Sequence, residues 1–171
     1  MRLFLLLGIL FSLGSASSVD KQLRSGIIRN SPSMVTEALK MGANPNQEVE
    51  KGRSLLMQAS YKGRTSQVKA LIKAGAKVNY IGKDGQTALL QAASGSNLDV
   101  IKLLIVNGAK VNHKAKSGTT ALKIAVLSED IEMVKYLLGK GADVTLPGLG
   151  KKDIRSLALE SKNKALIKLF K

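Results

Sequence analysis

Apolar residues recur along the chain in pairs three residues apart, and each pair returns 33 residues later. These pairs are Val68 and Leu71, Ile101 and Leu104, Val134 and Leu137, and Ile167 and Phe170. A spacing of three residues places two side chains on one face of an α-helix. Each pair therefore predicts a helix that buries one face. The constant step predicts that these helices occupy equivalent places in successive structural repeats.

Glycine, alanine and hydroxyl residues keep the same step. Gly-Ala pairs stand at residues 42–43, 75–76, 108–109 and 141–142. Glycine adopts the left-handed conformation that ends a helix, so each pair predicts the end of a second helix. Ser54, Thr87 and Thr120 each follow a glycine by two residues, and their hydroxyls can cap the start of a first helix. Small residues within that first helix would let neighbouring repeats approach closely: Ala59, Ala92, Ala125 and Ala158.

One 33-residue repeat cannot enclose a core of its own, so stability must come from contacts between neighbouring repeats. The stretch DGQTALLQAASGSNLDVIKLLIVNGAKVN resembles the ankyrin repeat, whose pattern is a turn, T-P-L-H-x-A-A, a second helix and G-A-D-V-N. The resemblance runs from about Asp20 to Lys171. It implies an all-α ankyrin-repeat solenoid of about five helix-turn-helix repeats, with projecting β-turn fingers.

The phasing of the glycines divides the chain. We expect a signal peptide over residues 1–16, an N-terminal capping repeat over 17–46, ankyrin repeats over 47–79, 80–112 and 113–145, and a C-terminal capping repeat over 146–171. In the first repeat we recognise a second helix, capped by Ser31 and starting at Pro32. The usual proline of the pattern is replaced by Leu55, Ala88 and Ala121. We therefore expect each repeat to be less stable than an ideal one.

Residues 1–16 have the layout of a secretory signal peptide: Arg2, an apolar run over 3–13, and small residues after it. Cleavage is expected after residue 16, and cleavage after residue 18 is the alternative. The apolar run is shorter than the roughly 20 residues that a transmembrane helix needs. We therefore expect a periplasmic or secreted protein without a membrane anchor.

Charge and composition limit the chemistry. The chain has 27 Lys and Arg against 12 Asp and Glu, a formal net charge of +15, which favours a partner with an acidic surface. It has no cysteine and one histidine, His113, which excludes thiolate sites and multi-histidine metal sites. No Ser-His-Asp set can be assembled around His113. We expect a protein that is not an enzyme and that needs no cofactor or metal.

Two other patterns suggest ligands, but each has a simpler interpretation. The glycines of YIGKDGQ and LPGLGKK do not reproduce the phosphate-binding loop motif, and they fit turns of the repeat. A lysine ladder follows the 33-residue step at Lys69, Lys102, Lys135 and Lys168. It suggests either a stripe for an anionic polymer or, as we favour, a solvated face. Nucleic acid is disfavoured because only 4% of residues are aromatic.

The family resemblance implies that a partner binds at the turn tips and at the exposed ends of the first helices. Carried over to this sequence, it nominates Arg53, Tyr61, Lys62, Tyr80, Ile81, Lys83, Asp84, Gln86, His113, Lys114, Lys116 and Leu127. We expect Tyr61 and Tyr80 to be exposed, and Tyr and Arg are enriched among binding hot spots. The alternative is that these tyrosines cover neighbouring turns without any partner.

Three classes of function remain: a secreted protein-binding module, a basic protein that binds an anionic polymer, and an enzyme of unrecognised type. The first is favoured because the resembled family binds proteins and no reactive constellation emerges. Within it, we expect an inhibitor or self-protection (immunity) protein that occludes a co-exported enzyme such as a peptidoglycan hydrolase. A scaffold, or an effector directed at a host protein, is the alternative. The free protein is expected to be a monomer.

Overall fold

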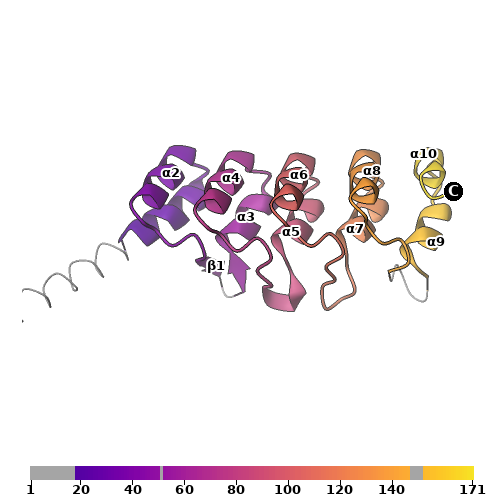
Figure 1. The fold of residues 1–171 in the computed structure, drawn as a ribbon, viewed down its shortest axis with the longest axis horizontal. Coiled ribbons are helices and arrows are strands. Elements are labelled where there is room, and N and C mark those ends of the chain that lie inside the picture. Colours follow the sequence, from indigo (N-terminus) through magenta and orange to yellow (C-terminus); the bar gives the residue numbers. More distant parts are fainter. Residues whose placement is uncertain (1–17, 51, 147–151) are drawn as a thin grey trace, which may run out of the picture.

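The computed structural model describes residues 18–50, 52–146 and 152–171. Within these ranges, five helical hairpins stand side by side in chain order (Figure 1). The first joins the helical residues 18–29 to α2 (Pro32–Lys40). The others are α3 (Leu55–Tyr61) with α4 (Thr65–Lys73), α5 (Ala88–Ser94) with α6 (Leu98–Val106), α7 (Ala121–Leu127) with α8 (Ile131–Gly139), and α9 (Ile154–Leu159) with α10 (Lys164–Lys168). The predicted all-α solenoid is confirmed.

The first repeat has both of its helices, whereas the sequence predicted only the second. Residues 18–29 are helical, and Val19, Leu23 and Ile27 are buried along one side. Their spacing of four residues is the signal that could have revealed this helix. It was missed because no turn glycine and hydroxyl cap precede it. The expected signal peptide over residues 1–16 lies outside the described residues.

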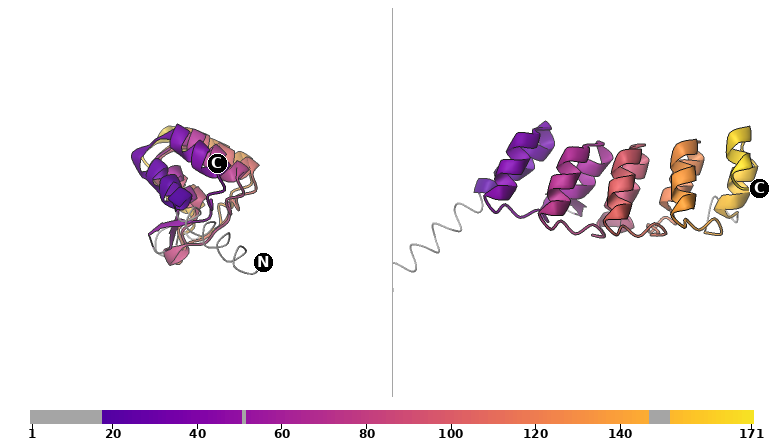
Figure 2. Two further views of the ribbon diagram at one scale, coloured as in Figure 1. Left: turned by 90° about the vertical axis from the view of Figure 1, so that its left-hand side faces the viewer. Right: turned by 45° about the horizontal axis from the view of Figure 1, so that its top comes forward.

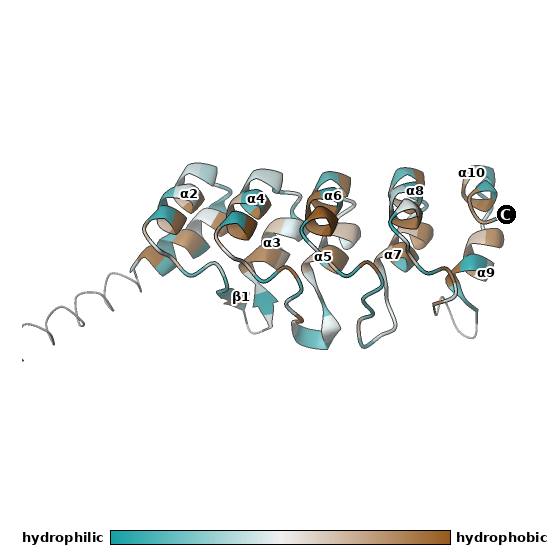
Figure 3. Cartoon of the chain, viewed as in Figure 1, coloured by the Kyte–Doolittle hydropathy of each residue, from teal (hydrophilic) through white to brown (hydrophobic). Residues whose placement is uncertain are grey.

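The turns between repeats project to one side of the stack, as the end-on view shows (Figure 2). We call residues 47–54 the first finger, 80–87 the second finger and 113–120 the third finger. The first finger contains two short antiparallel strands, β1 (Glu48–Glu50) and β2 (Arg53–Ser54), and the second contains the 3-10 turn η1 (Lys83–Gly85). Much of this projecting region is hydrophilic, while brown, apolar segments lie on the helices (Figure 3).

Hydroxyl caps start the first helices where the sequence predicts them. The side chains of Ser54, Thr87 and Thr120 each accept a hydrogen bond from the backbone NH three residues later, at 3.2, 3.3 and 3.1 Å. In the last repeat the Asp153 carboxylate takes this place and accepts from the backbone NH of Ser156 at 2.7 Å. That hydrogen bond lowers the pKa of Asp153. The capping of α2 by Ser31 is also confirmed, at 3.4 Å.

The Gly-Ala pairs end the second helices. Gly42, Gly75, Gly108 and Gly141 have φ angles of 87°, 89°, 84° and 78°. The backbone NH of the alanine that follows each glycine donates to a carbonyl five residues earlier, at 2.9 to 3.0 Å. This is the Schellman arrangement, which satisfies a terminal carbonyl of the helix. The local sequence thus sets the end of each second helix.

The core runs through the whole stack. The four alanines of the first helices, from Ala59 to Ala158, are fully buried, as are the apolar pairs of α4, α6 and α8. First helices pack on first helices, since α5 contacts both α3 and α7, and α7 contacts α9. Among the described residues, no helix is long and apolar enough to cross a bilayer.

Asparagine side chains join each repeat to the next. The Nδ2 atoms of Asn46, Asn79 and Asn112 donate to the carbonyl of the glycine that ends the next second helix, at 3.2, 2.8 and 3.0 Å. Their Oδ1 atoms accept from the backbone NH two residues beyond that glycine, at 2.8, 3.0 and 2.9 Å. We call these three residues the asparagine ladder. The sequence alone did not assign this role to them.

Proline at the start of α5 is expected to stabilise the protein. Ala88 is the first residue of this helix, and Thr87 before it has φ −131° and ψ 166°, the extended conformation that a residue preceding proline prefers. We therefore expect Ala88→Pro to raise the free energy of unfolding by about 0.5 to 1 kcal/mol. Urea denaturation measures the difference.

Leu55 provides the control, because it starts α3 in the same way but its backbone NH donates to the Gln47 carbonyl at 3.0 Å. Leu55→Pro removes this hydrogen bond and a buried leucine, so it is expected to lower stability. A loss of stability in Ala88→Pro would contradict the expectation.

Candidate functional site

Neighbouring fingers are held together by their backbones. The NH of Lys83 donates to the Gly52 carbonyl, and the NH of Lys116 donates to the Asp84 carbonyl, both at 3.0 Å. Gly52 has φ 75°, and a Cβ there would lie 2.8 Å from the Lys83 nitrogen. This approach requires glycine. The fingers therefore form one continuous surface beside the first helices.

An open groove of about 540 Å³ lies between the first and second fingers. Its lining comprises Glu50, Gly52, Arg53, Met57, Lys83, Asp84, Gln86 and Gln91. Four of these were predicted to bind a partner: Arg53, Lys83, Asp84 and Gln86. Met57 and Gln91 were not predicted, although each lies on a first helix within reach of a finger. The groove presents both signs of charge around the buried side chain of Met57.

Arg53, Tyr61 and Lys62 gather next to this groove. The Arg53 guanidinium carbon lies 5.7 Å from the centre of the Tyr61 ring, and the Lys62 Nζ lies 5.4 Å from it. Both distances suit cation–π attraction. Arg53 also forms an ion pair with Glu50 at 3.3 Å, and one third of its side chain is exposed. The predicted proximity of these three residues is therefore found, with the tyrosine partly exposed.

Tyr80 departs from the expectation that it is exposed. It is half-buried and packs against the core, and its hydroxyl donates to the Glu48 carboxylate. This hydrogen bond raises the pKa of Tyr80. Glu48 also accepts from the Gly52 backbone NH at 2.9 Å. Tyr80 therefore braces the first finger, whereas its neighbour Ile81 is 59% exposed.

His113 also connects two fingers. Its Nε2 lies 2.8 Å from the carbonyl oxygen of Gly85, and its side chain is half-buried. Because a carbonyl oxygen only accepts, Nε2 must carry the proton. The ring is thereby positioned as a brace between the second and third fingers. In the described part of the chain, no group of three or more His, Cys, Asp or Glu is placed to hold a metal ion.

The remaining predicted residues are exposed further along the surface. Lys114 and Lys116 lie in the third finger, and Leu127 ends α7 with half of its surface exposed. Tyr61 ends α3 in the equivalent position, and Ile28 stands 33 residues before Tyr61 and is also exposed. Sequence reasoning missed Ile28, although the repeat register would have found it. The first helices thus present a row of exposed apolar residues, interrupted by Ser94.

Comparison with known families identifies a match to the family model for ankyrin repeats, which spans three copies, over residues 26–115 and again over residues 56–147. Together these matches cover well over half of the chain. A comparison with curated proteins finds none that matches.

Proposed function

The chain belongs to the ankyrin repeat family and is a protein-interaction module, and from this premise we propose that it inhibits a co-exported enzyme in the periplasm. Its finger surface covers the working face of that enzyme, and a peptidoglycan hydrolase is the leading target. Enzymes that cut the cell-wall polymer endanger the cell that exports them. Occlusion by a bound protein is sufficient to protect that cell.

The observation that carries this proposal is the cluster of Arg53, Tyr61 and Lys62 beside the groove. Tyrosine and arginine supply much of the binding energy at protein interfaces. The two cations lie within 6 Å of the ring, so the aromatic face is already ordered before a partner arrives. Preorganisation of this kind lowers the entropy lost on binding.

Charge supports a partner with an acidic surface. The chain has a formal net charge of +15, and exposed Lys83 and Lys116 lie at the fingers. An acidic rim around an enzyme's active site would be attracted to this surface, which raises the association rate. The signal-like residues 1–16 support export of both proteins to the same compartment.

The test is an inhibition assay with purified, exported cell-wall hydrolases of the source cell. Release of labelled peptidoglycan is measured while the protein is added up to an equimolar amount. We expect inhibition that saturates near equal amounts and that Arg53→Glu abolishes. Lys135→Glu changes the charge equally on the exposed surface of α8, so it is the matched control and should still inhibit.

Other outcomes identify the alternative functions. Capture of a folded partner at a defined stoichiometry without inhibition of any hydrolase would favour a scaffold or a host-directed effector. Salt-sensitive binding to every polyanion, unchanged by Arg53→Glu, would favour a protein that binds an anionic polymer. Either result would reject the inhibitor proposal.

A further inference from the structure

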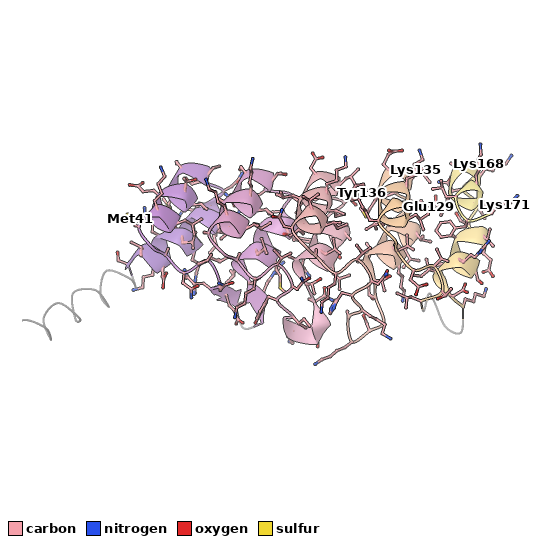
Figure 4. The ribbon with its side chains drawn as sticks, viewed as in Figure 1. Met41, Glu129, Lys135, Tyr136, Lys168 and Lys171 are labelled. Atoms are coloured by element: carbon pink, nitrogen blue, oxygen red, sulfur yellow. The ribbon has the colours of Figure 1, made fainter. Side chains whose placement is uncertain are left out.

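The second helices present a different face, away from the fingers. The lysine ladder, Lys69, Lys102, Lys135 and Lys168, is exposed along it. A second row lies four residues later in the chain and contains Lys40, Lys73 and Val106. Residues four apart share one face of a helix, so the two rows form one surface, which we call the outer face. Figure 4 shows Lys135 and Lys168 pointing outward from α8 and α10.

Carboxylates offset only part of this charge. Asp99 lies 3.9 Å from Lys102, and Glu132 lies 2.8 Å from Lys135. The corresponding positions before Lys69 and Lys168 hold Ser66 and Ala165, which carry no charge. Glu37 is a further carboxylate, in α2. The outer face therefore remains cationic along its length.

Apolar and aromatic groups lie among these lysines. Val106 is 77% exposed at the end of α6, and Met41 is 60% exposed just after α2. The half-buried ring of Tyr136 lies 5.9 Å from the Nζ of Lys102 and 5.6 Å from that of Lys140. Water gains nothing from contact with Val106 and Met41, whereas hydrocarbon would accept both.

We propose that the outer face binds peripherally to a membrane surface rich in anionic lipid. Lysines near such a surface are attracted to its head groups, and their long stems let the ammonium reach a phosphate while apolar neighbours enter the interface. Val106, Met41 and Tyr136 occupy the places where that contact would occur. A soluble polyanion matches the lysines but offers no hydrocarbon to Val106. The inference is independent of the proposed inhibition, since it uses the opposite side of the repeats.

Vesicle co-sedimentation tests this inference with the full chain. Binding to vesicles of phosphatidylcholine mixed with phosphatidylglycerol is compared with binding to phosphatidylcholine alone. The variant replaces Lys69, Lys102, Lys135 and Lys168 by glutamine. The matched control replaces four lysines that lie off the second helices by glutamine: Lys21, Lys77, Lys110 and Lys152. All proteins share residues 1–17, so any contribution from that segment is common to them.

We expect the preference for anionic vesicles to fall on the order of 100-fold in the ladder variant and much less in the control. An equal fall in both would show that total charge alone matters, and absence of any preference in the unaltered protein would also overturn the inference. Val106→Ser is the second variant. It should weaken vesicle binding about threefold and leave binding to soluble polyphosphate unchanged. An unaltered vesicle affinity in this variant, with equally tight polyphosphate binding, would identify a polymer-binding face instead.

Discussion

Replacement of Leu104 by alanine is expected to lower the free energy of unfolding by about 3 to 5 kcal/mol. Leu104 is fully buried in α6, which packs against α5 in its own repeat and against α4 in the repeat before. The substitution removes buried surface and leaves a cavity in the middle of the stack. Because each repeat is stabilised by its neighbours, this loss weakens the array at its centre. Urea denaturation followed by circular dichroism measures it.

Val106, two residues further in the same helix, is the control for this prediction. It is largely exposed, so Val106→Ala should change the free energy of unfolding by less than about 0.5 kcal/mol. Similar losses in the two variants would mean that α6 does not bury the face described here.

Tyr61→Ala and Arg53→Ala are each expected to weaken partner binding by about 2 to 4 kcal/mol, which is roughly 30- to 1,000-fold in the dissociation constant. Each substitution removes part of the ordered cluster next to the groove. Since the guanidinium lies 5.7 Å from the ring centre, the two effects should not be additive. Isothermal titration of the partner with the single and double variants measures both the losses and their coupling.

The fold of the protein variants provides the check on this result. Both residues lie at the surface end of α3 or in the first finger, so the far-ultraviolet circular dichroism should be unchanged. Lys135→Ala, on the outer face, should keep full affinity for the partner. Normal binding by Tyr61→Ala and Arg53→Ala, together with a loss in Lys135→Ala, would place the interface on the wrong side.

Features that depend on neighbouring residues could be predicted from the sequence. The caps at Ser54, Thr87 and Thr120 and the helix ends at the Gly-Ala pairs are examples, because each is set within a few residues of chain. Their 33-residue recurrence then identified the solenoid. The first helix of the first repeat was missed because its apolar spacing has no turn motif beside it.

Contacts between residues far apart in the chain could not be predicted in the same way. Tyr80 was expected at the surface, but its hydroxyl reaches Glu48, 32 residues earlier. His113 reaches the carbonyl of Gly85, 28 residues earlier. Both contacts depend on how closely one finger approaches the next. The periodic pattern predicted which residues lie in the fingers, but it could not predict which of them brace the fingers and which remain free for a partner.

The asparagine ladder bears on how a gene of this kind can change in length. Asn46, Asn79 and Asn112 bind the next repeat through its backbone carbonyl and NH groups, which every repeat supplies whatever its side chains. An in-frame duplication or deletion of 99 nucleotides, the coding length of one 33-residue unit, would therefore leave each new junction with both of its hydrogen bonds. Recombination can lengthen or shorten such an array without redesigning the joint, and selection is then left to choose the surface.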